Sequence, residues 1–157
     1  ENMVSIFLPR GRKNEENFVI VSVNGRSWKI MKGVQVQVPD YVAEVLENSR
    51  MMAETARYIG QSGAEGIKFH LLHVLRNTDL AAEWQAGRVQ TLELEEYISI
   101  LELCLRNLPP EAVIHRLTGD GAKRDLLAPL WSGDKKRVLN AIHQAFLRDN
   151  LIQGSTL

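Results

Sequence analysis

Cysteine is almost absent from this sequence, because Cys104 is the only one among 157 residues. A disulfide within the chain needs two thiols, and a Cys-rich zinc or iron–sulfur motif needs several, so the composition excludes both from this chain. We therefore expect no metal site and no cofactor bound by this chain alone. The low cysteine content also favours a reducing, cytoplasmic compartment, in which Cys104 would be a buried and inert thiol.

An excess of one charge and long apolar runs are absent as well. Lys and Arg together number 19 and Asp and Glu together 19, so the net charge is zero and no basic field attracts nucleic acid or an anionic membrane. No apolar run approaches the roughly 20 residues of a membrane span, and no signal peptide is recognisable. We expect neither nucleic acid nor a membrane as partner.

The first segment of the chain has the pattern of β-structure. Apolar residues alternate with other residues over 17–38, which is typical of half-buried strands. The dipeptides Asn24-Gly25 and Lys32-Gly33 separate the runs as turns, and Asn-Gly favours a tight hairpin. Pro39-Asp40 then ends the third strand and begins a short helix over Tyr41–Asn48. The pattern predicts a three-stranded β-meander followed by a helix.

From Met51 onward the pattern changes to alternating helices and strands. Turn residues bound two apolar runs. We expect Gly66–Leu75 to contain a buried strand and the loop that leaves it, and Ala112–Thr118 to be another buried strand of the same parallel sheet. Helical spacing of apolar residues predicts four helices, over 51–59, Asp79–Gln85, Glu93–Asn107 and Asp134–Arg148, and we expect a loop over Gly119–Pro129. This change of pattern predicts two domains, 1–50 and 51–157. Because no Gly-, Ser- or Pro-rich linker lies near residue 50, we expect the two domains to be joined directly.

Three motifs carry a resemblance to a known family. They are GIKFHLLHVLRNTDLAAEWQAG (66–87), LPPEAVIHRLTGDG (108–121) and LLAPLWSGDKKRVLNAI (126–142). With them, residues 51–154 resemble the C-terminal part of the YhcC-type radical SAM proteins. The resemblance implies an α/β segment, the last βα units of a partial (β/α) barrel, within an overall α+β or α/β chain. It also implies a family whose complete members bind a [4Fe–4S] cluster and S-adenosylmethionine.

The chain departs from the resembled family in its cysteines. Radical SAM proteins bind their cluster through a Cys-x-x-x-Cys-x-x-Cys motif, and only Cys104 is present here. The resemblance then predicts an incomplete C-terminal portion of a radical SAM protein, which is not catalytic alone unless a second chain supplies the cluster.

The first segment resembles a different group of proteins. Residues 3–50, and above all VSVNGRSWKIMKGVQVQVPDYVAEVLENS (21–49), are similar to small proteins encoded among phage structural genes. The two resemblances meet at Ser49–Met52, which suggests a chimera, natural or engineered. The alternatives to the radical SAM hypothesis are therefore a phage-type structural or protein-interaction module, and a recombined chain without selected activity.

Five residues form the candidate site. If the strands belong to a barrel, His70, His73, Arg116, Thr118 and Asp120 gather at its C-terminal rim, where barrel active sites form. Arg116 would clamp a carboxylate or phosphate, and Asp120 would hold a ribose or orient a histidine. The alternative is an Arg116–Asp120 ion pair that ties the loop down. His70 and His73 would face opposite sides of a strand, so we expect no metal there.

The incomplete barrel also leads to an expectation about partners. Half a barrel exposes sheet edges that the missing strands would cover, and exposed edges pair with other chains. We expect a homo-oligomer or a protein partner that covers the edges, particularly along residues 66–74.

Overall fold

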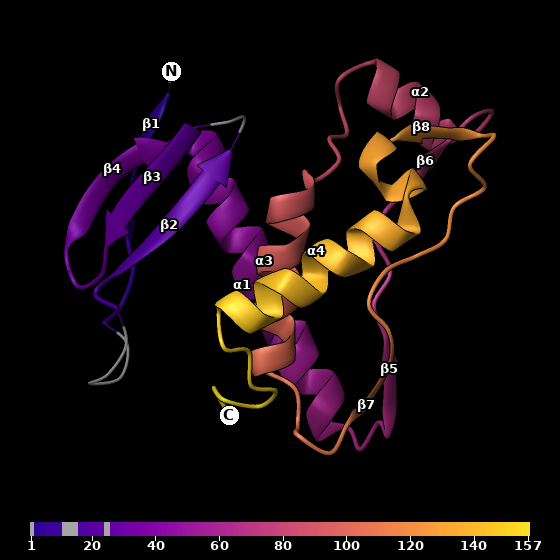
Figure 1. Cartoon of the computed structure of the whole chain (residues 1–157). Coiled ribbons are helices and arrows are strands. Elements are labelled where there is room, and N and C mark those ends of the chain that lie inside the picture. The colour runs from indigo at the N-terminus through magenta and orange to yellow at the C-terminus, as the bar shows by residue number, and fades with distance from the viewer. Residues whose placement is uncertain (1, 11–15, 24–25) are drawn as a thin grey trace. The chain divides into compact units, whose positions relative to one another are not determined.

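The computed structural model describes residues 2–10, 16–23 and 26–157, and the chain divides into two compact units, 1–52 and 53–157. Helix α1 (Asp40–Gln61) belongs to both units (Figure 1). The prediction of two separate helices, over 41–48 and 51–59, is wrong. No proline or glycine separates these two stretches, and the Ser49 hydroxyl, which would favour a cap, donates instead to the Val45 carbonyl at 2.8 Å. The junction predicted near residue 50 therefore lies inside a continuous helix.

The first unit contains two antiparallel two-stranded sheets. Strands β2 and β3 form one sheet, and β1 and β4 form the other. Their bounds are β1 (Met3–Phe7), β2 (Phe18–Val23), β3 (Arg26–Met31) and β4 (Gln35–Pro39). The predicted meander is wrong, because β4 pairs with β1 rather than with β3. The Asn24-Gly25 turn lies outside the described residues.

The turn after β3 explains this pairing. Gly33 has a φ of +78°, which residues with a Cβ rarely adopt, and its amide donates to the Leu8 carbonyl at 2.7 Å. This bond directs the chain toward β1 instead of back along β3. The predicted alternation holds in the new arrangement, because Val21, Ile30, Val38 and Val42 form the buried core of the unit.

The helices of the second unit agree well with the predictions. They are α2 (Asp79–Gln85), α3 (Leu94–Arg106) and α4 (Lys135–Arg148), with the 3-10 helix η1 (Leu130–Gly133) before α4. Glu93 and Glu96 form a reciprocal capping box at the start of α3, and the Asp134 side chain caps α4. None of the helices in the described residues is long and apolar enough to cross a membrane.

Two small sheets complete the second unit. Strand β5 (Gly66–Lys68) pairs in parallel with β7 (Val113–Arg116), and β6 (Val74–Leu75) pairs antiparallel with β8 (Leu126–Ala128). The strand and following loop predicted over 66–75 agree with β5 and the irregular chain after it, but β6 at the end of this range was not predicted. The uninterrupted loop predicted over 119–129 is wrong, because β8 lies within it. The expected burial is absent from β5 and β7 themselves, whose residues are exposed or half-buried, with Val113 55% exposed. The described residues form a mixed α+β arrangement with no closed barrel.

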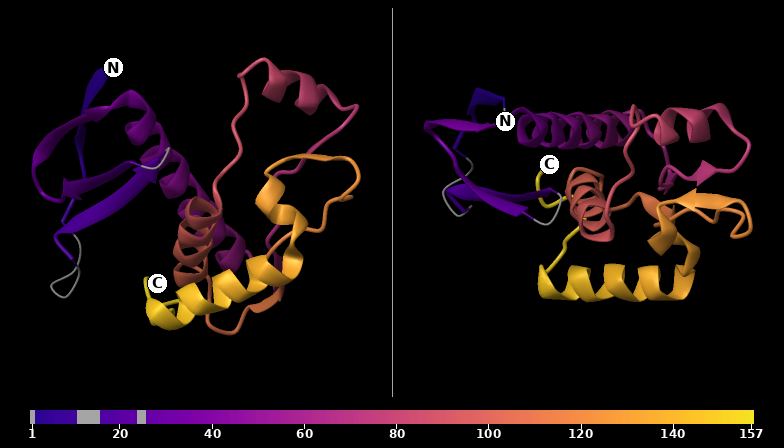
Figure 2. Two further views of the ribbon diagram at one scale, coloured as in Figure 1. Left: turned by 45° about the horizontal axis from the view of Figure 1, so that its top comes forward. Right: turned by 90° about the horizontal axis from the view of Figure 1, so that it is seen from above.

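One apolar cluster holds the second unit together. In Figure 2, α3 lies between α4 and the C-terminal part of α1. The buried residues of α3 form one cluster with Ala56 of α1 and with residues of α4. The α3 and α4 residues of this cluster are Leu94, Ile98, Leu101 and Leu105 of α3 and Val138, Ile142 and Ala145 of α4. Burial of such side chains stabilises by about 1.5–3 kcal/mol each, so this cluster dominates the stability of the unit.

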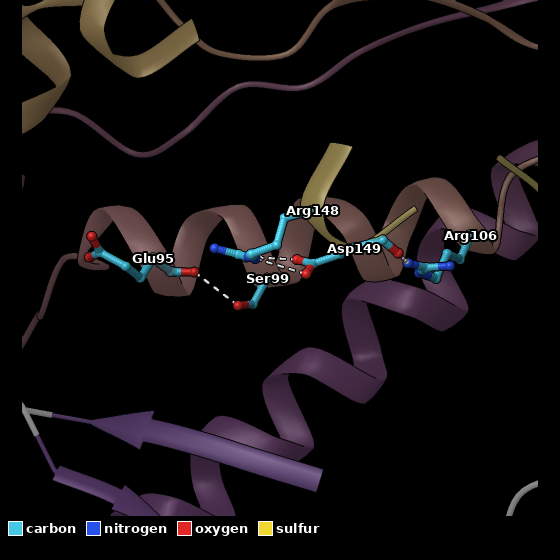
Figure 3. A network of polar contacts seen from close by, with 5 residues as sticks. All are labelled: Glu95, Ser99, Arg106, Arg148 and Asp149. Carbon is cyan, nitrogen blue, oxygen red and sulfur yellow. Dashed lines mark hydrogen bonds and ion pairs between the residues drawn. The ribbon is translucent and has the colours of Figure 1, made fainter. Parts of the chain in front are cut away.

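Polar contacts fasten the C-terminal end of α4 to α3 (Figure 3). The Arg148 guanidinium donates to both carboxylate oxygens of Asp149 at 2.8 and 2.7 Å, and Arg106 of α3 donates to the Asp149 carbonyl at 3.0 Å. Ser99, one turn into α3, donates to the Glu95 carbonyl at 2.9 Å. The bond from Arg106 thus joins α3 to the residue that follows the last turn of α4.

Candidate functional site

The segments that follow the two parallel strands meet in the second unit. Residues 69–73 follow β5, residues 117–121 follow β7, and both leave the sheet at the carboxyl ends of their strands. The amide of Phe69 donates to the Arg116 carbonyl at 2.8 Å, so the segments remain adjacent where the strand pairing ends. Crevices at the carboxyl ends of parallel strands are where α/β proteins place binding sites.

Two glycines allow the segments to approach closely. A Cβ added to Gly119 would lie 2.5 Å from Cε1 of His70, and one added to Gly121 would lie 2.9 Å from Cδ2 of His73. Each imidazole therefore occupies the space that a side chain would need. We refer to His70, His73, Gly119, Asp120 and Gly121 as the His–Gly rim.

The two imidazoles contact each other at this rim. Their ring centroids lie 5.5 Å apart with an interplanar angle of 82°. The prediction that they face opposite sides of a strand is wrong, because the chain between them is irregular and the alternation of a pleated strand does not apply.

A hydrogen bond defines the neutral form of His70. Its Nδ1 lies 2.8 Å from the Leu71 carbonyl oxygen. Since a carbonyl only accepts, we assign the proton to Nδ1, which leaves the lone pair on Nε2 in the neutral ring.

His73 is the more enclosed of the two histidines. Its Nε2 is buried and has no hydrogen-bond partner among the described residues. Burial lowers the pKa of His73 below its usual 6.5, repulsion from His70 lowers it further, and the Asp120 carboxylate opposes both effects. His73 is therefore neutral at pH 7, with one polar nitrogen left without a partner.

The other predicted residues divide between the rim and the surface. Asp120 pairs with Lys135 of α4, with 3.2 Å between Oδ2 and Nζ, and not with Arg116, whose side chain is exposed at the end of β7. Thr118 is buried, and its hydroxyl lies 3.5 Å from the Gly119 carbonyl oxygen. The structure thus brings His70, His73 and Asp120 together beside Thr118.

The sequence analysis missed three contributors to this site. Gly119 and Gly121 flank Asp120, and a Gly-x-Gly triplet after a strand was a signal of close backbone approach. Lys135 was not assigned to the candidate site, because it lies at the start of the predicted helix over 134–148. Its contact with Asp120 joins positions 15 residues apart, which no local pattern predicts.

A buried tyrosine anchors the start of the 117–121 segment. The Tyr97 hydroxyl of α3 donates to the Leu117 carbonyl at 2.7 Å, and burial raises the pKa of Tyr97 to about 12. The Tyr97 ring also packs against Trp131, whose Nε1 donates to the Leu92 carbonyl at 2.9 Å. Tyr97 therefore ties the rim to the core of the unit.

The described residues do not fit the iron–sulfur cluster that the resemblance implies. Such a cluster is held by several thiolates. Cys104 lies in α3 with 1% of its surface exposed, and burial raises the pKa of its thiol to about 11. No group of three or more His, Cys, Asp or Glu side chains in the described residues is arranged to hold a metal ion.

Comparisons with known proteins support the resemblance of the second segment. The model of the radical SAM C-terminal domain family matches residues 64–148, more than half of the chain. The chain is 36% identical over 109 residues to the uncharacterized protein YtqA of Bacillus subtilis (strain 168), and the aligned stretch covers 69% of this chain and 34% of YtqA. It is 33% identical over 104 residues to protein YhcC of Escherichia coli (strain K12), and the aligned stretch covers 66% of this chain and 33% of YhcC.

A more distant relative, an uncharacterized protein of Methanocaldococcus jannaschii, is 26% identical over 110 residues, or 69% of this chain and 34% of that protein. The chain spans about a third of the length of the curated relatives it matches. The similarity of residues 3–50 to phage proteins has no support in these comparisons and stays a prediction.

The matched residues 64–148 contain both segments of the His–Gly rim, together with the helices α2, α3 and α4. The site and most of the core that positions it therefore lie within the matched domain. This chain belongs to the radical SAM C-terminal domain family.

Proposed function

We propose that this chain supplies a C-terminal, substrate-side part of a radical SAM-type enzyme and does not itself bind the cluster or start the radical reaction. The observation that carries the proposal is the convergence of the segments after β5 and β7 at the His–Gly rim. The carboxyl ends of parallel strands are where such folds place substrate. The single buried cysteine supports the second half of the proposal.

The rim offers groups suited to orienting a polar substrate. Neutral His73 carries an unpartnered Nε2, and the His70 ring is held by the contact of its Nδ1 with the Leu71 carbonyl oxygen. Asp120 and Lys135 add one charge of each sign, both partly exposed. In this proposal the partly exposed Asp120 and Lys135 orient the substrate, and the Nε2 of His73 exchanges protons with it only once movement of the 117–121 segment exposes that nitrogen.

The proposal is tested by cluster reconstitution of the full chain. The chain is incubated anaerobically with ferrous iron, sulfide and dithiothreitol, beside a family member that contains the three-cysteine motif. We expect an iron–sulfur absorption band and a reduced-state EPR signal for the family member and neither for this chain. Mixing the two proteins, after removal of the C-terminal part of the family member, should restore reductive cleavage of S-adenosylmethionine. Cleavage by this chain alone would overturn the proposal.

A second candidate function concerns the first unit. Its strands carry large apolar side chains on their outward faces, including Phe7 at 59% exposed, Ile20 at 65% and Met31 at 43%. Such faces commonly mark interaction surfaces. We infer a protein-interaction role for this unit, with a homo-oligomer as the expected assembly. Sedimentation velocity of the full chain and of Ile20→Ser tests it: a species larger than a monomer should weaken in the variant, and a monomer at all concentrations argues against it.

A further inference from the structure

We propose that the 117–121 segment closes over His70 and His73 only while the His73 imidazole is neutral, so that acidification opens the His–Gly rim. The opening regulates the same site as the proposed function. A role of this opening in catalysis rests on the proposed function, but the opening itself does not depend on that function.

The close packing of the rim is the first support. The His70 and His73 rings occupy the positions that a Cβ on Gly119 and on Gly121 would take, and Gly119 is buried. The rings thus lie against the loop backbone with no room for a side chain between them. His73 is only partly exposed and its Nε2 is buried, so a proton added to that ring would create a charge that lacks hydration on the side facing the loop.

The unpartnered nitrogen of His73 is the second support. An imidazolium donates from both nitrogens, and Nε2 of His73 is buried without an acceptor among the described residues. Protonation while the segment stays closed would bury an unsatisfied N–H on a charged ring. Moving the 117–121 segment away exposes Nε2 to water and removes this penalty.

The charges around His73 come from three elements. His70, from the same segment, repels a charge on His73 across 5.5 Å, and Asp120 of the opposite segment attracts it. Lys135 of α4 engages the Asp120 carboxylate, and the two side chains are 46% and 62% exposed, so solvent screens the attraction. Farther along the loop, Lys123 and Arg124 are exposed, and Arg124 lies 3.7 Å from Asp125.

The balance of these effects favours the neutral ring. Burial is the largest influence on the pKa of His73 and acts in the same direction as repulsion from His70, while Asp120 compensates only in part. Protonation and closure therefore oppose each other, and a fall in pH shifts the segment toward the open state.

His115 provides a matched control within the chain. It also packs against a glycine, because a Cβ on Gly66 would clash with its ring, but its side chain is exposed on β7. Protonation of His115 leaves the charge hydrated. We expect no structural consequence at that position.

Hydrogen exchange on the full chain tests the proposal. After correction for intrinsic exchange rates, amide protection over residues 119–122 should fall by a factor of roughly three to ten between about pH 7.5 and pH 5, relative to α3 and α4. His73→Gln is neutral at both pH values and should abolish the change. His115→Gln should behave as wild type.

Two outcomes overturn the proposal: protection over 119–122 that does not change with pH, or a change that persists in His73→Gln. If that variant does not fold, NMR titration of the wild-type imidazoles replaces it. The midpoint of the loop amide shifts must then coincide with that of His73, and separate midpoints overturn the proposal. None of these readouts involves a cluster or a partner, so failure here is distinguishable from failure of the proposed function.

Discussion

His70 and His73 face each other edge to face, with 5.5 Å between their ring centroids, although only two residues separate them in the chain. The contact exists because the chain leaves the strand after Lys68 and turns irregularly until Val74. The glycines of the opposite segment complete it by admitting the rings against bare backbone. This arrangement makes the rim sensitive to small changes in size and charge.

A methyl group at position 119 should displace His70. Gly119→Ala would bring its Cβ to 2.5 Å from His70, whose exposed ring is able to swing aside. We expect a loss of about 1 kcal/mol in unfolding free energy, together with a changed NMR shift of the His73 ring. Gly133→Ala is the control, because its Cβ would meet only ordinary contact at 3.5 Å. An unchanged His73 spectrum would contradict the packing described here.

Replacement of Asp120 should lower the pKa of His73 further. The Asp120 carboxylate raises this pKa against burial and His70, so Asp120→Asn removes the opposing effect. The folded state binds the proton more weakly than the unfolded state, whose histidine titrates near 6.5. Stability should therefore be fully present above about pH 6.5 and fall over a wider acid range than in wild type. Imidazole NMR and urea unfolding as a function of pH measure both effects, with Asp125→Asn as the control; a raised pKa in Asp120→Asn would contradict the assignment.

Removal of the Tyr97 hydroxyl should weaken the attachment of the rim to the core. Tyr97→Phe leaves the Leu117 carbonyl without its 2.7 Å bond, at a tyrosine that is 7% exposed. We expect a loss of about 1–2 kcal/mol in unfolding free energy, as for other buried hydrogen bonds. Tyr58→Phe is the matched control, since Tyr58 is 74% exposed and should change stability by less than about 0.5 kcal/mol. Equal losses in the two variants would show that the Leu117 bond contributes nothing.

A neutral side chain at position 102 should stabilise the protein at neutral pH. Glu102 has a buried Oε1 without a partner among the described residues, and burial followed by the nearby Asp149 raises its pKa above 4.5. A bond between two carboxyl groups needs a proton on one of them, which Glu102 lacks when ionised. Its favourable contribution is thus present below about pH 4.5 and lost as the pH rises through the raised value.

Glu102→Gln supplies a permanent donor toward Asp149 and should raise the unfolding free energy at pH 7 by roughly 0.5–1 kcal/mol, a value discounted for partial exposure. At pH 4 the gain should nearly vanish. Glu65→Gln, at an exposed position, serves as the control. Denaturant unfolding at pH 7 and pH 4 measures the gain in unfolding free energy. An equal gain at both pH values would exclude ionisation of Glu102 as its cause.

Gly60 tests the packing of α1 within the second unit. A Cβ at this position would overlap the ring of Pro109, which cannot rotate away. Alanine favours a helix over glycine by about 1 kcal/mol, but overpacking against a rigid ring costs about 1–3 kcal/mol. Gly60→Ala should therefore lower the melting temperature, while Gln61→Ala, at an exposed position of the same helix, should not.

The local predictions that succeeded rest on short-range chemistry. The helices α2, α3 and α4 were predicted nearly to the residue, because caps such as Glu93 and Asp134 and apolar stripes such as Leu94 to Leu105 lie within one helix. The alternation of β2, β3 and β4 was also correct. Similarity of motifs in turn identified the family, since residues 66–142 contain all three.

The failures concern pairing between distant segments. The partner of β4 is β1, and the partner of β6 is β8, although neither β1 nor β8 had a pattern strong enough to be predicted. The continuity of α1 was missed because Asn48 and Ser49 are weak helix formers, whereas a hydrogen bond from Ser49 to Val45 is compatible with the helix.

The sequence by itself determined the composition limits, the helix ends and the family, because each depends on residue identity or on neighbours within one or two turns. It also placed His70, His73, Thr118 and Asp120 in one candidate site, through the rule that strand ends share an edge. Only the tertiary structure decided that the two imidazoles touch, that Gly119 and Gly121 admit them, and that Asp120 pairs with Lys135 instead of Arg116. Those contacts depend on how segments 15 to 50 residues apart are brought together by a shared core, and no local pattern encodes that placement.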